Sequence, residues 1–458
     1  MRSKKHLSFT SLRKALSKCF NGIKDHRQIN KTKHTIHDVL MSGFACMHFQ
    51  DPSLLQFQKR LEKHYHRSNL KTLFGITTIP EATQMRDIID EINSEEYRPF
   101  FNEYFYRLQR GKHLEQFQMF PGLYLAPMDG TQYFSSDSVS CKGCLKTKLK
   151  DKEPKEDSLC DEDEDAESDV NFSHKMVQIA IMHPNMKQVI PLMPEEISNE
   201  DGTTKQDCEM NAAKRLIPKV RKDHPQLGLI FGGDDLFSRQ PIIHDVLTVQ
   251  AHYIFVAKPT SHKYLNEWLD AYPKLHNKSI TDKDGVQHVY EWMNNVPLYG
   301  SADSIITNYF RYQMIKIDEK GEAKVTYRNS WVTDLEVDEK NVEAMVKGGR
   351  CKWKIENECF NTLKNQGYSI DHSYGHGDEN LCINFYLLTL MAFAFHQIFE
   401  LTDKLYQECR RHFGSKRHLW ENIRAYLRTF VFDTWELLLD FTLNPENYNT
   451  DKPIMSSA

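Results

Sequence analysis

One stretch decides the fold: Leu227-Gly228-Leu229-Ile230-Phe231-Gly232-Gly233-Asp234-Asp235, a short apolar run followed by two glycines and two acids. An apolar run of this length, bounded by turn residues, is typical of a buried strand. Ligand-binding groups in α/β sheets gather where such strands end, and glycine lets a ligand approach the backbone closely. Asp234 is therefore a candidate functional residue.

The flanking segments predict a mixed α/β sheet around this strand. In chain order, the predicted elements are strands at 123–134, 175–182 and 187–193, a helix at 208–221, the strand at 227–231, a helix at 241–248 and a strand at 253–257. Three strands followed by alternating helices and strands are the order expected of a mixed sheet. Further strands are predicted between about 283 and 348, including 286–292 and 324–331.

Helices are predicted at both ends of the chain. Between residues 1 and 115, apolar residues recur at helical spacing, as at Ile36, Val39, Leu40 and Phe44. Residues 1–80 carry 15 Lys and Arg against 4 Asp and Glu, although the whole chain has a net charge of −4. Two interpretations of this basic region stay open, a DNA-binding module and ordinary basic surface helices.

The segment 381–399 contains no Lys, Arg, Asp or Glu and is therefore a membrane candidate by length. It also contains Asn384, His396 and Gln397, which are costly in lipid. We therefore expect a buried core helix and no membrane partner. The start of the chain predicts no secretory signal peptide, and the scattered cysteines fit a reducing cytoplasm.

A second candidate acid lies in a predicted long helix that begins near Cys351. Trp353, Glu356, Phe360 and Leu363 fall at i, i+3, i+7 and i+10, so they are expected to share one face packed on the sheet. A buried carboxylate needs a cation. Two cations stay open: Lys352, four residues earlier, and a metal ion.

A third candidate, Asp129, ends a strand-like run in Met128-Asp129-Gly130-Thr131. Because a central strand tolerates proline poorly, Pro127 predicts that pairing begins only at Met128. Acids from two strand ends and one helix can hold two hard cations. Two such ions about 4 Å apart suit an in-line phosphoryl displacement.

Between about residues 123 and 397, these segments resemble the DDE transposases of bacterial insertion sequences, in the cut-and-paste group with a Y-R-E-K signature. Met128-Asp129-Gly130-Thr131 resembles the strand of the first acid, and Gly233-Asp234-Asp235-Leu236-Phe237 resembles that of the second. Trp353-Lys354-Ile355-Glu356 resembles the segment of the third, and Gly375-His376-Gly377 resembles the stretch downstream. Three positions depart from the signature. Gly349 occupies the position of its tyrosine and Lys352 that of its arginine, and Lys364 lies one residue later than the spacing of the signature predicts.

The resemblance implies an α/β, ribonuclease-H-like catalytic core at 116–400, with an acidic loop at 150–170 and a β-rich insertion at about 262–348. Helical regions at 1–115 and 401–458 would flank it. Asp129, Asp234 and Glu356 would bind Mg²⁺, with Mn²⁺ as a substitute, while Asp235 and Glu358 stay open as replacement ligands. Lys258, Lys352 and Lys364 would contact DNA phosphates.

The activity that this family implies is cleavage of transposon DNA ends and strand transfer into target DNA. Terminal inverted repeats and target DNA would be the partners, bound by a synaptic homodimer in the bacterial cytoplasm, at the nucleoid. Two alternatives stay open, a stand-alone metal-dependent DNA nuclease and an inactive DNA-binding relic of a transposase.

A separate cluster is suggested by Cys141-Lys142-Gly143-Cys144, followed by Cys160 and His174. One C-x-x-C pair with irregular later ligands is a weaker zinc pattern than two such pairs. Two interpretations stay open, a structural Zn²⁺ site formed by Cys141, Cys144, Cys160 and His174, and ordinary reduced cysteines.

Overall fold

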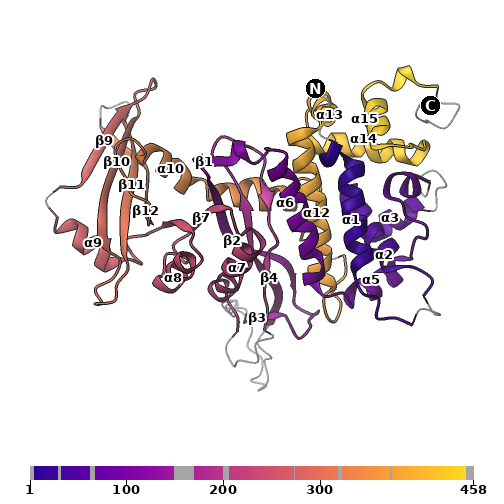
Figure 1. Cartoon of the computed structure of the whole chain (residues 1–458), viewed down its shortest axis with the longest axis horizontal. Helices are drawn as coiled ribbons and strands as arrows, with labels where there is room; N and C mark the ends of the chain where they lie inside the picture. Colours follow the sequence, from indigo (N-terminus) through magenta and orange to yellow (C-terminus); the bar gives the residue numbers. More distant parts are fainter. Residues whose placement is uncertain are drawn as a thin grey trace, which may run out of the picture.

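A computed structural model of the 458-residue chain describes residues 5–28, 32–61, 68–148, 170–199, 206–272, 274–317, 322–371 and 374–449. Within these ranges, one 12-stranded sheet runs through the molecule. Nine of its strands follow the order β3-β4-β2-β7-β8-β12-β11-β10-β9, while β1 pairs with β2, and β5 and β6 pair with β4. Helices from the two ends of the chain gather at one end of the molecule, beyond β4, and β9–β12 lie at the other (Figure 1). The sheet confirms the predicted mixed α/β class.

The middle of the sheet is formed by β2 (Leu123–Ser136), β4 (Val170–Ile181), β7 (Gly228–Gly233) and β8 (His252–Val256). β2 runs antiparallel to β4 and parallel to β7, which runs parallel to β8. The parallel strands need crossover connections, and α7 (Glu209–Asp223) and α8 (Gln240–Thr248) lie before and after β7. The shorter strands at this end are β1 (Gln118–Phe120), β3 (Leu145–Lys148), β5 (Ile190–Pro191) and β6 (Glu195–Ile197).

An antiparallel extension continues the sheet beyond β8. Its strands are β9 (His276–Thr281), β10 (Gln287–Pro297), β11 (Ile306–Ile317) and β12 (Ala323–Thr333), of which β12 pairs with β8. α9 (Lys263–Asp270) precedes the extension and α10 (Val342–Arg350) follows it. These strands occupy the segment in which the sequence predicts a β-rich insertion.

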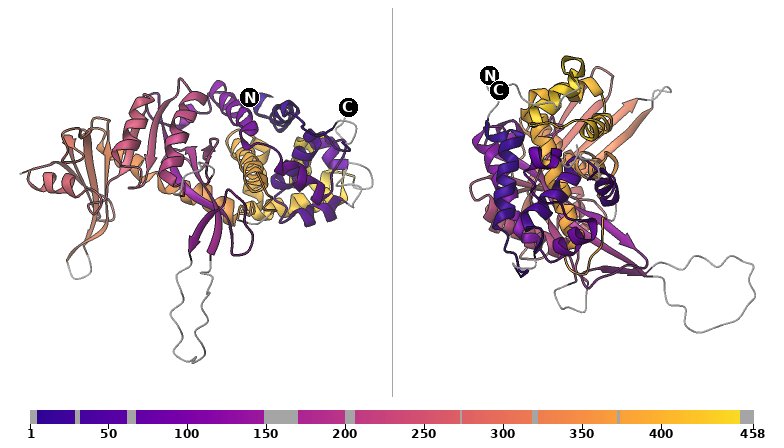
Figure 2. Two further views of the ribbon diagram at one scale, coloured as in Figure 1. Left: turned by 90° about the horizontal axis from the view of Figure 1, so that it is seen from below. Right: turned by 90° about the vertical axis from the view of Figure 1, so that its right-hand side faces the viewer.

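Helices from both chain ends enclose α12 (Leu381–Thr402), as the two views in Figure 2 show. The N-terminal helices are α1 (Phe9–Gly22), α2 (Ile36–His48), α3 (Leu54–Leu61), α5 (Ala82–Asp90) and α6 (Arg98–Arg110), and the C-terminal ones are α13 (Lys404–Phe413), α14 (Lys416–Thr429) and α15 (Trp435–Leu443). Short helical turns are η1 (Lys5–Leu7), η3 (Leu70–Phe74), η4 (Ser94–Tyr97), η5 (Glu115–Phe117) and η7 (Pro445–Asn447).

α12 is the core helix that the sequence predicts. It is long and apolar enough to cross a membrane, yet 94% of its most apolar window is buried inside the protein. Asn384 and His396 each have a hydrogen-bond partner there: Asn384 Nδ2 donates to the carbonyl oxygens of Ile89 and Ile92, both 2.7 Å away. His396 Nδ1 shares a 2.6 Å hydrogen bond with the Tyr368 hydroxyl. These bonds satisfy one polar atom of each side chain, whereas Asn384 Oδ1 and His396 Nε2 are buried without a hydrogen-bond partner in the described residues.

Two local predictions about strands are wrong. The run 187–193 forms only the two-residue strand β5. Pro127 does not delay pairing, because β2 pairs with β7 from Leu123 through Pro127 and with β4 from Met128 onward. On the β4 side, Leu125 forms an isolated bridge with Met182 in the same register as Met128 with Ile179, so the missing N–H of Pro127 lies in the gap between that bridge and the ladder. The acidic stretch 151–169 lies outside the described residues.

The N-terminus of α12 is capped by a side chain from α5. The Asp90 carboxylate accepts hydrogen bonds from the backbone N–H groups of Asp378, Glu379, Asn380 and Leu381, at 2.7–3.1 Å. Of these donors, the Leu381 N–H belongs to the first turn of α12, whose N–H groups have no partner within the helix, and the other three belong to the segment that leads into it.

We predict that Asp90→Ala lowers the free energy of unfolding by about 1–2 kcal/mol, the usual cost of losing a helix cap. Chemical denaturation followed by circular dichroism measures this change. Asp87→Ala removes the same charge from an exposed position on α5 and is the matched control. Equal stability of the two variants would contradict the capping role.

Candidate functional site

Asp129 and Asp234 lie next to each other because β2 and β7 are parallel and in register. Leu123 to Pro127 pair with Gly228 to Gly232. The same offset, continued by two residues, sets Asp129 beside Asp234. Burial raises the pKa of the Asp129 carboxyl, and the nearby Asp234 carboxylate raises it further, against the opposing effect of Lys352. Two carboxylates therefore lie close together at the carboxyl end of β7, and burial disfavours the charged form of Asp129.

A third carboxylate, Glu209, belongs to this place and was not predicted. It is the first residue of α7, and its Oε1 would lie 2.2 Å from a Cβ built at Gly130. The Glu209 side chain therefore packs directly against Gly130, and any larger residue there would displace the carboxylate. Burial raises the pKa of Glu209, and the charges of Asp129 and Asp234 raise it further. Acids are common in the first turn of any helix, so the sequence holds no signal that sets Glu209 apart.

Lys352 supplies the positive charge next to these acids. Its Nζ lies 3.0 Å from Asp129 Oδ2, and both side chains are mostly buried. The positive charge of Lys352 lowers the pKa of Asp129 and of Glu209. Lys352 is one of the two cations considered as the partner of Glu356, and in the structure it is paired with Asp129.

The predicted face of Trp353, Glu356, Phe360 and Leu363 is wrong. Trp353 is 58% exposed and Glu356 is exposed, whereas Ile355, Cys359, Phe360 and Leu363 are buried. The predicted helix is present at 353–365 but is not a regular α-helix, because η6 (Ile355–Phe360) is π-helical and runs directly into α11 (Asn361–Asn365). A π-helix adds residues to each turn, so a count at 3.6 residues per turn assigns the wrong face.

The position of Glu356 in this site stays a prediction. η6 lies against β2, and Glu356 follows Lys352 by four residues, about one helical turn. Across the described part of the chain, however, Asp129, Asp234 and Glu356 do not form a group with ligand atoms within 4.8 Å of one another.

Asp235 is engaged in holding the loop after β8. Its Oδ1 accepts a 2.7 Å hydrogen bond from the backbone N–H of Lys258 and lies 3.7 Å from His262 Nε2. Asp235 is buried and Asp234 is only half-buried, which favours Asp234 as a ligand.

Lys258 is exposed at the end of β8, and Lys364 is half-buried in α11, so their contacts with DNA phosphates stay predictions.

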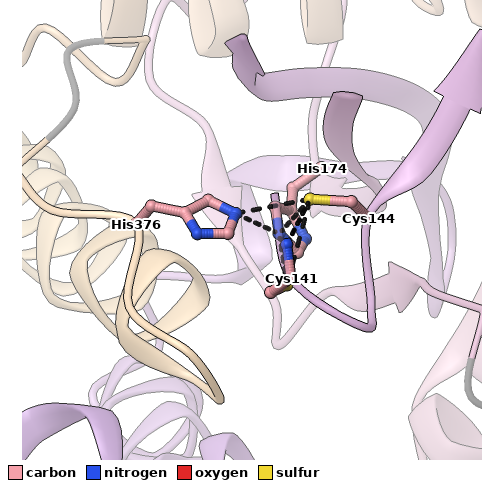
Figure 3. A group of neighbouring side chains, drawn as sticks. All are labelled: Cys141, Cys144, His174 and His376. Atoms are coloured by element: carbon pink, nitrogen blue, oxygen red, sulfur yellow. Dashed lines mark hydrogen bonds between the residues drawn. The ribbon is translucent and has the colours of Figure 1, made fainter. Parts of the chain in front are cut away.

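A second constellation joins Cys141, Cys144, His174 and His376 (Figure 3). Their ligand atoms all lie within 4.8 Å of one another, and this set could bind a zinc ion. The predicted members Cys141, Cys144 and His174 are thus brought together, while Cys160 lies outside the described residues. The fourth member, His376, was not assigned to this cluster from the sequence, although it lies in the quoted Gly375-His376-Gly377 stretch.

Comparisons with known proteins yield a weak structural similarity. No protein-family model matches the chain, and no curated protein matches it. Among solved structures, a piggyBac transposase synaptic complex with hairpin DNA is similar, with a TM-score of 0.40 and 12% identity, over 97% of this chain and 81% of that one. A likeness of this strength assigns neither fold nor function.

We predict that Glu209→Gln stabilises the protein at neutral pH, because it removes one charge from a crowded group of half-buried acids. The gain should be on the order of 1 kcal/mol near pH 7.5. The raised pKa means that the wild-type side chain is protonated first in the folded state as the pH falls. The gain should therefore disappear below the unfolded pKa of about 4.3.

Thermal unfolding from pH 4 to 8 measures this effect. Glu356→Gln is the matched control, since an exposed substitution should change stability by less than about 0.5 kcal/mol. A gain for Glu209→Gln that is the same at every pH, or no gain at all, would show that the acids do not repel one another.

Proposed function

We propose that this chain is a DDE transposase, which cleaves transposon DNA ends and transfers the strands into target DNA with divalent metal ions. The observation that carries the proposal is the pair Asp129, on β2, and Asp234, directly after the parallel strand β7, which lie side by side and are both half-buried. Phosphoryl transfer needs such fixed charges, because the protein's task is to position the reacting groups and neutralise charge.

The strand order supports a ribonuclease-H-like core. β4, β2, β7 and β8 are adjacent in this order, with β4 antiparallel and the other three mutually parallel. α7 and α8 alternate with the parallel strands, and β9–β12 intervene before the segment that carries Glu356. This is the arrangement that the resemblance to DDE transposases implies, with a β-rich insertion ahead of the third acid.

The residues present fit Mg²⁺ or Mn²⁺. Carboxylate oxygens are the donors that these hard cations prefer, and the acid group has raised pKa values at Asp129 and Glu209 that a bound cation would reverse. When bound, two such ions activate the attacking water or 3′-hydroxyl and stabilise the leaving oxygen. The protein's part is to hold Asp129 and Asp234 in register and to keep the group poorly hydrated.

The third acid is proposed to be Glu356. Its exposed side chain follows Lys352 by one turn, and Lys352 already reaches Asp129. Glu209 is the competing third ligand, and its charge coupling to both aspartates favours it as a member of the site. Glu358, half-buried in η6, stays a weaker replacement for Glu356.

Lys352 is proposed to meet a DNA phosphate as a point charge, since lysine lacks the two-pronged geometry of the arginine in the family signature. Lys258 and Lys364 would add phosphate contacts, which position DNA without reading its sequence. No side chain need act as a covalent nucleophile.

The remaining parts of the proposal rest on the resemblance to bacterial insertion-sequence transposases. They are recognition of terminal inverted repeats, a synaptic homodimer, and action at the nucleoid in the cytoplasm. The basic region 1–80 supplies the positive charge that DNA binding needs. The domain limits at 115 and 400 also remain proposals.

We predict that alanine at Asp129, Asp234 or Glu356 reduces cleavage and joining at least about 10³-fold, because each removes metal-borne stabilisation of several kcal/mol. The assay uses a labelled duplex that carries the element's flanking inverted repeats, with Mg²⁺. Asn357→Ala, at an exposed position of the same helical segment, is the matched control and should remain within a few fold of the wild type.

The products separate the alternatives. Cleavage without joining would indicate a stand-alone nuclease. Binding to the ends without chemistry, even with Mn²⁺, would indicate an inactive relic. If Glu209→Ala abolishes both steps and Glu356→Ala does not, Glu209 is the third acid.

A further inference from the structure

The four side chains of the Cys/His cluster come from three separate parts of the chain. Cys141 and Cys144 lie in the turn between β2 and β3, where the Cys144 N–H donates to the Cys141 carbonyl oxygen at 3.3 Å. His174 lies within β4, and His376 lies in the loop between α11 and α12. The rings and sulfurs point toward one centre (Figure 3).

The distances between these atoms match the edges of a zinc tetrahedron. With Zn–S of about 2.3 Å and Zn–N of about 2.05 Å, a regular tetrahedron has edges of about 3.8 Å (S–S), 3.6 Å (S–N) and 3.3 Å (N–N). The Cys141–Cys144 sulfurs are 3.9 Å apart, and the two histidine Nε2 atoms are 3.2 Å apart. The sulfur-to-Nε2 distances are 3.4, 3.4 and 3.3 Å, for the pairs Cys141–His174, Cys144–His174 and Cys144–His376.

Hydrogen bonds on the far side of each ring orient both histidines toward the centre. His174 Nδ1 lies 3.2 Å from Glu196 Oε1, which also accepts a hydrogen bond from the Tyr133 hydroxyl. His376 Nδ1 lies 2.7 Å from the Gly377 carbonyl oxygen. In metal sites, a ligating histidine almost always donates its other N–H to a carboxylate or a backbone carbonyl. Both rings of this cluster meet that condition.

The backbone around His376 is built for this position. Gly375 and Gly377 have φ values of +142° and +72°, which other residues adopt only with strain. A Cβ at Gly377 would lie 2.4 Å from Asp90 Oδ1, and Arg86 Nε donates to the Tyr374 carbonyl oxygen at 2.8 Å. The loop is thus held to α5 on one side, while His376 faces the sheet on the other.

We propose that Cys141, Cys144, His174 and His376 bind one structural zinc ion that joins the β2–β4 end of the sheet to the loop before α12. A closed set of four protein ligands with no open position is the mark of a structural site. The ion would cross-link residues 202 positions apart in the chain, and clips that close long loops restrict the unfolded chain most. This inference does not depend on the transposase proposal.

Metal analysis of the full-length wild-type protein, purified without added metal or chelator, should find about one zinc per chain. His376→Ala and Cys144→Ala should each lower the zinc content at least about tenfold, because a missing ligand opens the coordination sphere. Cys208→Ala is the matched control, since Cys208 is exposed at the start of α7 and should not affect zinc. Cys160→Ala should also retain zinc.

A second measurement keeps the proposal testable if a variant folds poorly. Apo wild-type protein titrated with Co²⁺ should develop thiolate-to-cobalt charge-transfer bands and strong visible bands of a tetrahedral site, which Zn²⁺ then removes. Chelation should lower the melting temperature of the wild type by roughly 5 °C or more, and chelator should not lower that of His376→Ala further.

Wild-type protein without zinc and without the cobalt spectrum would overturn the proposal. So would zinc that survives in His376→Ala but is lost in Cys160→Ala, since the fourth ligand would then be Cys160. Glu356→Ala should bind zinc as the wild type does, so failure of the catalytic proposal and failure of the zinc proposal are told apart.

Discussion

The parallel register of β2 and β7 is the constraint on which the proposed chemistry depends. Backbone pairing from Leu123 to Pro127 places Asp129 beside Asp234, and hydrogen bonds of the sheet cannot relax to separate them. Glu209 enters the same space because Gly130 has no side chain. The fold therefore holds three acids close enough to repel one another. Such electrostatic repulsion is common at functional sites, where a bound cation or a basic side chain neutralises the charge. In this structure Lys352 supplies part of that charge.

Features that depend on chain order and strand pattern could be predicted from the sequence. The mixed sheet, the buried helix at 381–399 and the neighbouring aspartates follow from apolar runs with glycine and acid at their ends. The exposed face of the Glu356 segment could not be predicted, because a π-helix between Ile355 and Phe360 changes the residue count per turn. Glu209 could not be identified either, since its role arises only from packing against Gly130.

In the Cys/His cluster too, the ligands that are close in sequence could be predicted, whereas the ligand that is distant in sequence could not. The C-x-x-C pair is a local signal, and it predicts a metal site with incomplete ligands. His376 lies 202 residues beyond His174, and only the docking of the loop on Asp90 and Arg86 brings it to the sheet. This docking also ties the start of α12 to α5. The helical end of the molecule and the proposed catalytic sheet are therefore connected through one loop, which begins soon after the segment that carries Glu356.

The central claim is that Asp129 and Asp234 share a divalent ion in a DNA-processing site. The most direct measurement is a structure of the protein with end DNA and Mn²⁺, in which anomalous scattering locates the metal. The account predicts a peak that contacts both aspartates, a second peak about 4 Å away on the third acid, and Lys352 moved from Asp129 to a phosphate. An intact Lys352–Asp129 pair with no metal at either aspartate would contradict it.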